Sequence, residues 1–346
     1  MGTLVISSHE DAIAAVPHVL GFHPQESLVL MPFNQELPWV RVDIPQTEAD
    51  CVRLWDESLR EVLASHARRA ARPVGVAVLC FTSDRANAAA TSRDIGRRLG
   101  AIGVRVPVRL WTSGSVWVEF NTAAAGRCSQ EAADTMAATS VYGGSVRPAA
   151  SREAMATSMV GDRGPVAALL KDDPAAANPV GERDWASTRV RGFLADGARL
   201  SDADAARLLV AVQTTTIRDA LWKQMTRENS HDHQALWIDL TRRAPDQVRA
   251  PAATLAAFSS WLAGDGAKAW CALDQVPVDQ SYSMAAVVAG VLEAALPPRE
   301  WEEHRKALAG LTSDLDESFV PRPIAAFQSH ATPDRGPSAD RHPPAR

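Results

Sequence analysis

The 346-residue sequence has no apolar stretch approaching the roughly 20 residues that a membrane-spanning helix needs. In the segment from Val16 to Leu30, histidine, proline, glutamine and glutamate interrupt the apolar residues. The first residues also lack the basic and apolar regions of a secretory signal peptide. We therefore predict a cytoplasmic protein that makes no membrane contact.

Cysteines are few and widely spaced. The four of them, Cys51, Cys80, Cys128 and Cys271, form no Cys-x-x-Cys pair. In a chain of this size, the pattern indicates buried, reduced thiols rather than a disulfide framework or a zinc site. We expect no bound metal.

Signals for nucleotide cofactors and for nucleophilic serines are also missing. The sequence contains neither Gly-x-Gly-x-x-Gly nor a Walker A motif, and it has no Gly-x-Ser-x-Gly. Only 4 of the 36 basic residues are lysines, and the net charge is −5. This composition argues against a nucleic-acid-binding surface. We expect no cofactor and favour a protein that is not an enzyme.

Residues 1–147 alternate strand and helix patterns, which predicts an α/β domain with a mixed sheet. The strand patterns are "TLVIS", "SLVLMPF", "WVRVDIP" and "VGVAVLCFT"; the last, a continuous apolar run, is typical of a strand buried on both faces. Helix patterns cover residues 48–70 and 83–103. "VRVPVRLW" and "VWVEF" predict a hairpin, in which Pro107 indicates an edge strand or a bulge.

Residues 148–312 carry helix patterns in series, separated by Gly, Pro, Asp or Ser. They predict an all-α domain, either a helical bundle or a solenoid-like helical repeat. The segment from Pro251 to Pro277 is weakly similar to a tetratricopeptide unit. Residues 313–346 lose this periodicity and predict a disordered, Pro-rich tail.

A dense motif, "AVPHVLGFHPQESLVLMPF", covers residues 15–33. In a structural interpretation, Ser7 or Ser8 caps a helix that Pro17 kinks or divides into two pieces. Gly21 then ends this helix in a left-handed conformation, and Phe22 makes the hydrophobic contact that accompanies such a cap.

The same motif admits a catalytic interpretation, in which His23 activates Ser27. A nucleophilic serine needs a base within hydrogen-bonding reach and a third group that orients the base. A separation of four residues on a turn does not establish a contact between His23 and Ser27. Pro24 needs no catalytic explanation, because it prevents the helix from continuing. We favour the structural interpretation.

This stretch resembles the opening of a bacterial family common in actinobacteria, the domain-of-unknown-function family 4192. That opening reads Pro, two residues, Leu-Gly-Phe, any residue, Pro, two residues, Ser-Leu-Val, then a strand ending in Asp-Leu-Pro. The matching residues are Pro17, Leu20, Gly21, Phe22, Pro24, Ser27, Leu28, Val29, Asp43, Ile44 and Pro45, of which Ile44 departs from the pattern. Similar features at Ser151, at Ile217 and over residues 236–275 extend the resemblance to about residues 4–300. It implies no assigned activity.

Three residues near predicted strand ends are candidates for a ligand site: Asp43, Thr82 and Asp84. Ligands bind at strand ends in open α/β sheets. For Asp43 we favour the alternative, in which it is the first residue of an Asp-x-Pro turn. Thr82 and Asp84 precede a helix without a Gly-rich loop, which favours helix capping over anion binding.

Two further groups of polar residues have structural explanations. Arg109 and Glu119 lie on the two arms of the predicted hairpin, and we expect a cross-strand ion pair on a solvent-facing surface, with a polar groove wall as the alternative. Alternation also predicts that Val104, Val106, Val108 and Leu110 share one face. His231 and His233 are spaced unsuitably for a helical metal pair, so we expect exposed histidines beside an N-cap at Ser230 or Asp232.

The favoured function is a non-catalytic interaction or scaffold protein whose helical domain binds a protein partner. The candidate anchor residues are Arg218, Trp222, Trp261 and Trp270. This role requires that at least one of these tryptophans is exposed and faces the others across a groove. The alternative is a small-molecule-binding α/β domain or enzyme with its site near Asp43, Thr82 and Asp84.

Overall fold

The computed structural model describes residues 6–34, 37–142, 147–170 and 179–301, and its first part is built on one six-stranded sheet. The strands are β1 (Ser27–Pro32), β2 (Val40–Asp43), β3 (Gly75–Phe81), β4 (Arg105–Thr112), β5 (Val116–Glu119) and β6 (Ala125–Arg127). Their spatial order is β2-β1-β3-β4-β5-β6. The β3–β4 pair is parallel and the other pairs are antiparallel, so the sheet is mixed, as predicted. The predicted tail lies outside the described residues.

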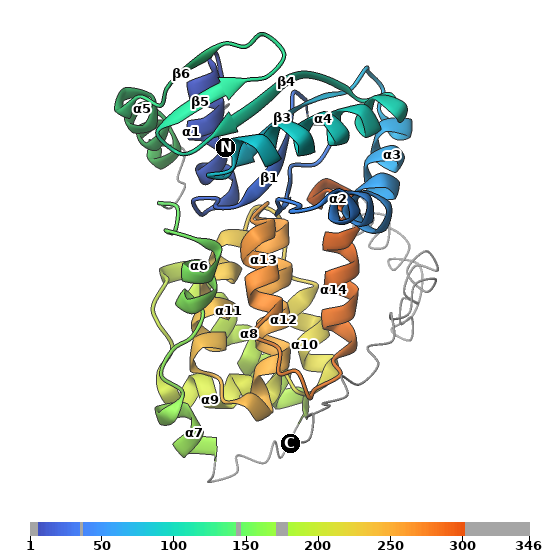
Figure 1. The fold of residues 1–346 in the computed structure, drawn as a ribbon. Helices are drawn as coiled ribbons and strands as arrows, with labels where there is room; N and C mark the ends of the chain where they lie inside the picture. The colour runs from blue at the N-terminus through green and yellow to red at the C-terminus, as the bar shows by residue number, and fades with distance from the viewer. Residues whose placement is uncertain (1–5, 35–36, 143–146, 171–178, 302–346) are drawn as a thin grey trace, which may run out of the picture. The chain divides into compact units, whose positions relative to one another are not determined.

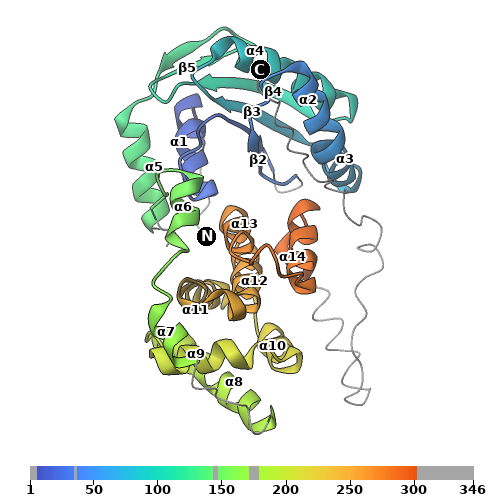
Figure 2. The same ribbon diagram turned by 60° about the horizontal axis from the view of Figure 1, so that its bottom comes forward.

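Helices cover both faces of this sheet (Figures 1 and 2). One face packs on α2 (Glu48–Leu54), the π-helical turn η1 (Trp55–Leu59), α3 (Arg60–Arg69) and α4 (Arg85–Ala101). The other face packs on α1 (His9–Leu20), which in turn contacts α5 (Gln130–Tyr142). Because β3 lies between these layers, all seven of its residues are buried, as its continuous apolar sequence predicts.

A bulge in β4 changes the direction of its side chains. Between Gly75–Ala77 of β3 and Arg105–Val108 of β4, the pairing register gains one residue on β4, beside Pro107. The predicted bulge is therefore present, and its extra residue inverts the alternation. Val106 packs toward α4, whereas Val108 packs on the α1 side. The expectation that the valines of this strand share one face is wrong for this reason.

The rest of the described chain is helical, as predicted. Its helices are α6 (Arg152–Ser158), α7 (Gly164–Leu169), α8 (Pro179–Asp196), α9 (Asp202–Ala211), α10 (Thr215–Trp222), α11 (Ser230–Arg243), α12 (Asp246–Leu262), α13 (Gly266–Leu273) and α14 (Ser283–Glu293). Every residue from Val248 to Leu262 is buried, and α12 contacts α9, α11, α13 and α14. It is the central helix of this region. Among the described helices, none has both the length and the apolarity that crossing a membrane requires.

Candidate functional site

The sheet brings the predicted strand-end residues to one edge. Ser27, the first residue of β1, pairs with Asp43 at the end of β2 and with Phe81 at the end of β3. Thr82 and Asp84 follow β3 directly, so all three predicted ligand residues lie at the same edge of the sheet.

The side chains at this edge are largely occupied by local hydrogen bonds. Thr82 is 5% exposed, and its hydroxyl donates to the Glu26 carboxylate at 2.7 Å and accepts from the Asp84 backbone N–H at 3.1 Å. Asp84 caps α4 by accepting from the Asn87 backbone N–H at 2.9 Å. Asp43 faces solvent and forms an ion pair with Arg41 at 2.8 Å. Two of the three candidates therefore have structural roles, and helix capping by Asp84 is confirmed.

The dense motif contains a helix end that joins the sheet region to the helical region. Ser8 forms a capping box with Asp11, and α1 continues through Pro17 without dividing into two pieces. Gly21 follows in the left-handed conformation, with a φ of 77°. Phe22 is 2% exposed and belongs to the hydrophobic core of the helical region. The backbone pairs with Ala149, which donates to Gly21 and accepts from His23.

Ser27 is held by hydrogen bonds rather than activated. Its hydroxyl donates to the Gln25 carbonyl at 2.6 Å and accepts from Arg41 Nε at 2.9 Å. The Arg41 guanidinium also lies 5.7 Å from the centre of the Phe22 ring. His23 is exposed and forms no hydrogen bond with Ser27 in the described structure. Arg41 therefore connects the side chains at this edge. Sequence reasoning missed it, because its only local signal is its position on the same strand, two residues before Asp43.

The predicted partner-binding tryptophans of the helical region are buried to different degrees. Trp261 is 6% exposed and donates from Nε1 to the Leu296 carbonyl at 2.9 Å. Trp222 is half-buried, and both tryptophans pack against Phe258, at 5.2 Å and 5.4 Å between ring centres. Trp270 is also half-buried.

The remaining predicted anchor, Arg218, is engaged within the helical region. It pairs with Asp219 in α10 and donates to the Tyr282 hydroxyl at 2.8 Å. The hydrogen bond to Tyr282 links α10 to the start of α14. The structure therefore brings Trp222 and Trp261 together around Phe258, and each of the four anchor residues is buried or half-buried.

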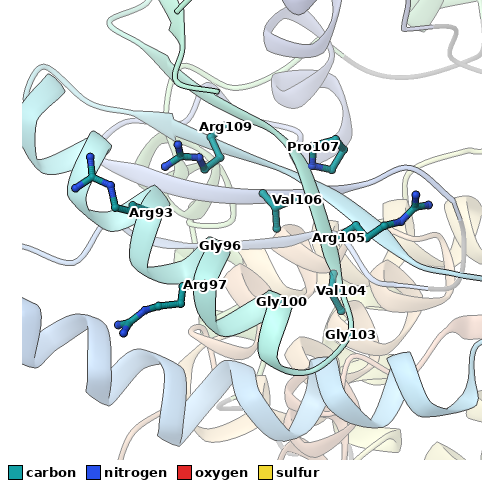
Figure 3. A pocket seen from close by; sticks show the side chains of 10 residues that line it. All are labelled: Arg93, Gly96, Arg97, Gly100, Gly103, Val104, Arg105, Val106, Pro107 and Arg109. Carbon is teal, nitrogen blue, oxygen red and sulfur yellow. The ribbon is translucent and has the colours of Figure 1, made fainter. Parts of the chain in front are cut away.

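A depression of about 600 Å³ lies elsewhere, between α4 and the first half of β4 (Figure 3). We call it the arginine groove. It is lined by Arg93, Gly96, Arg97, Gly100, Gly103, Val104, Arg105, Val106, Pro107 and Arg109. A Cβ atom at Gly96 would lie 3.6 Å from Arg109 Cδ and 3.9 Å from Val106 Cγ1, so the absence of a side chain at Gly96 lets β4 side chains approach α4 closely.

The arginines of the groove differ in their directions and their partners. Figure 3 shows Arg93 and Arg97 extending from α4 and Arg109 extending from β4 toward α4, whereas Arg105 points away from α4. Arg97 forms an ion pair with Asp94. Arg109 Nε donates to Asn121 Oδ1 at 2.8 Å, and its guanidinium lies 6.0 Å from the centre of the Phe120 ring. Among the described residues, neither Arg93 nor Arg109 has a carboxylate partner.

The expected ion pair between Arg109 and Glu119 is absent. Glu119 is 1% exposed, and its carboxylate accepts from the backbone N–H groups of Arg109, Asn121 and Thr122 and from the Thr122 hydroxyl. Burial by itself would raise the pKa of Glu119, but these hydrogen bonds hold it below its ordinary value. Because the backbone satisfies Glu119, the Arg109 guanidinium is free to line the groove.

His233 is also placed differently from its prediction. Helix α11 begins after Asn229, and its first turns bury His233 completely while His231 stays exposed. Neither ring nitrogen of His233 has a hydrogen-bond partner in the described structure. Desolvation lowers the pKa of His233 to about 4. The imidazole is therefore a neutral core group at physiological pH. Among the described residues, no cluster of His, Cys, Asp and Glu could hold a metal.

The comparisons with known proteins identify the family of the chain. The model of the family described as "Domain of unknown function (DUF4192)" matches residues 10–299. Because this match covers most of the chain, the chain belongs to that family. Neither the curated proteins nor the solved structures contain a significant match.

Proposed function

We propose that this protein is a non-catalytic interaction protein that binds an anionic partner in the arginine groove. The observation that carries this proposal is the pair Arg93 and Arg109, which lie beside one open depression without a carboxylate partner among the described residues. Guanidinium groups bind carboxylates and phosphates through charge-assisted, often bidentate hydrogen bonds. Asn121 holds Arg109 by Nε, which leaves its two terminal nitrogens available for a ligand.

The chemistry of the lining favours binding over catalysis. The ten lining residues are arginine, glycine, valine and proline. Arginine stays protonated at neutral pH, and none of the other three residue types carries a side chain that transfers protons or attacks a substrate. A partner recognised here would be held without being converted.

The sequence-based alternatives stay predictions. A protein partner on the helical region would use Arg218, Trp222, Trp261 or Trp270, and a ligand site at the strand ends would use Asp43, Thr82 or Asp84. The arginine groove is preferred because two of its charged groups, Arg93 and Arg109, have no carboxylate partner among the described residues, whereas internal hydrogen bonds or ion pairs occupy most of those other side chains.

The proposal is tested with fluorescein-labelled hexaglutamate, whose binding is followed by fluorescence anisotropy at low ionic strength. We expect Arg93→Glu to raise the Kd about fivefold to tenfold, because it replaces an attraction of roughly 1 kcal/mol by repulsion. The matched control is Arg127→Glu, which changes the net charge equally at an exposed site on β6. Equal effects of the two substitutions would show that the peptide binds elsewhere.

A further inference from the structure

We infer that the arginine groove binds a phosphorylated side chain of a protein partner, and that Arg93 and Arg109 hold its dianionic phosphate monoester between them. This inference rests on the proposed function and specifies the chemistry of its anionic partner. Two observations carry it: both guanidinium groups line one depression, and Arg109 is held in a fixed orientation.

Gly96 brings the two arginines within reach of one ligand. Arg93 and Gly96 are three residues apart on α4, so their Cβ positions are neighbours on one face of the helix, about 5–6 Å apart. A Cβ at Gly96 would lie 3.6 Å from Arg109 Cδ. Arg109 Cδ is thus at most about 10 Å from Arg93 Cβ. Because Arg93 is exposed and its long side chain has many rotamers, one small anionic group can contact both guanidinium groups.

The positive charge of these two groups is not compensated by the described residues. Neither Arg93 nor Arg109 has a carboxylate partner there, whereas Arg97 pairs with Asp94 and Arg105 points away from α4. Like charges that face one depression repel each other, and an anion between them relieves this repulsion. A carboxylate side chain supplies one negative charge, but a phosphate monoester supplies about 1.5 to 2 at neutral pH. The charge of the site therefore matches a phosphate monoester.

Asn121 holds Arg109 in place for such a ligand. Arg109 Nε donates to Asn121 Oδ1 at 2.8 Å, and Asn121 Nδ2 donates to the Pro107 carbonyl at 2.8 Å. Fixing a side chain before binding lowers the entropic cost of association. Asn121 is therefore a positioning residue, which leaves both terminal nitrogens of Arg109 for the ligand and does not neutralise their charge.

The shape of the phosphate group also suits two guanidinium groups. One bidentate guanidinium engages both oxygens of a carboxylate, whereas a phosphate monoester has three terminal oxygens and can accept hydrogen bonds from a second guanidinium as well. Two converging arginines thus favour phosphate over carboxylate.

A protein segment is the carrier of phosphate that best fits an open groove. A small molecule is usually enclosed by its pocket, whereas Arg93, Gly100 and Arg105 are exposed. Single-stranded nucleic acids stack their bases on aromatic side chains, and no aromatic residue is among the ten that line the groove.

The test compares two fluorescein-labelled peptides that differ only at their central residue, which is phosphoserine in one and glutamate in the other. Fluorescence anisotropy with the full-length protein at about pH 7.5 should show fivefold to tenfold tighter binding of the phosphoserine peptide. The preference should decrease at about pH 5.5, because the second pKa of the phosphate is about 6 and the monoanion then predominates. Glutamate stays ionised over this range and provides the internal control.

Two substitutions locate the preference in the groove. Arg93→Gln removes one of the two positive charges at an exposed position and should reduce the preference to less than about twofold, whereas Arg127→Gln on β6 should leave it intact. Asn121→Asp gives Arg109 a carboxylate partner and should have the same effect as Arg93→Gln. Its matched control is Gln25→Glu, which also changes an exposed amide to a carboxylate and should leave the preference intact.

The outcomes separate this inference from the proposed function. If no acidic probe responds to Arg93→Glu, the proposed function fails. If hexaglutamate responds but the two peptides bind equally, or if the preference persists in Arg93→Gln, the groove binds anions and the assignment to phosphate is overturned. Thermal denaturation verifies that Asn121→Asp is folded, and Arg93→Gln decides the outcome if it is not. Displacement of the phosphoserine peptide by inorganic phosphate or by a six-nucleotide single-stranded DNA at lower concentration than by unlabelled peptide would overturn the assignment to a protein segment.

Discussion

The Arg41 guanidinium donates from Nε to the Ser27 hydroxyl at 2.9 Å, and it also forms an ion pair with Asp43 at 2.8 Å. Because Ser27 and Asp43 are paired residues on neighbouring strands, this one side chain ties β1 to β2 at the edge of the sheet. Ser27 and Asp43, two of the residues that carry the family resemblance, are thus partners of the same arginine. This relationship explains both residues without any catalytic role.

We predict that Ser27→Ala lowers the free energy of unfolding by about 1 kcal/mol, because Arg41 loses a hydrogen-bond acceptor. Urea denaturation measures this change. In a double-mutant cycle with Arg41→Lys, the coupling energy should also be about 1 kcal/mol, since lysine does not reproduce the directed Nε–H bond. Covalent labelling of Ser27 by a fluorophosphonate, abolished by His23→Ala, would instead establish a nucleophilic serine.

We predict that Gly21→Ala is more destabilising than Gly103→Ala. Both glycines have positive φ values, 77° and 81°, so both substitutions cost about 1–2 kcal/mol in backbone strain. At Gly21 the new Cβ would also lie 3.0 Å from the buried Met155 Cε, whereas no atom lies within 4 Å of the position at Gly103. The free energies of unfolding of the two variants, measured by thermal denaturation, should differ by about 1 kcal/mol. Equal stabilities would mean that Met155 moves aside without cost.

We predict that the protein loses stability as the pH falls from about 6.5 toward 4, through protonation of His233. Desolvation lowers the pKa of His233 to about 4 in the folded protein, so the unfolded chain binds this proton more tightly. The stabilising effect is complete above the unfolded pKa and decreases below it by up to about 3 kcal/mol.

Chemical denaturation at a series of pH values measures this dependence on His233. His233→Leu should remove that part of the pH dependence and retain stability at pH 7, because neither ring nitrogen has a partner to lose. The control is His231→Leu, at an exposed position in the same helix, which should leave the pH dependence unchanged. An unaltered pH profile in His233→Leu would contradict the assignment.

We predict that Glu119→Gln destabilises the β4–β5 hairpin by about 2–3 kcal/mol. The carboxylate accepts four hydrogen bonds, and an amide NH₂ group would face some of those donors. Faster hydrogen exchange at the Asn121 and Thr122 amides would locate the effect. Glu131→Gln, at an exposed position on α5, provides the control and should change stability little.

Local patterns in the sequence determined the type and order of most elements. The continuous apolar run of β3, the capping box at Ser8 and the left-handed glycine after α1 depend on neighbouring residues alone, and each is found as predicted. The same locality explains the bulge at Pro107, since proline lacks the N–H that a regular strand requires.

Only the tertiary structure decided which side chains meet. Arg41 and Ser27 are 14 residues apart, and their contact depends on how β1 and β2 pair. The arginine groove depends on the bulge, because one extra residue in β4 turns Arg109 toward α4. The regular alternation of side chains along a strand, from which the sequence-based prediction was made, does not include this reversal. The sequence predicts an exposed His233 beside an N-cap at Ser230 or Asp232, but α11 begins after Asn229 and its packing buries His233. The burial of His233 and the meeting of these side chains depend on elements that are distant in the sequence, and therefore no local pattern specified them.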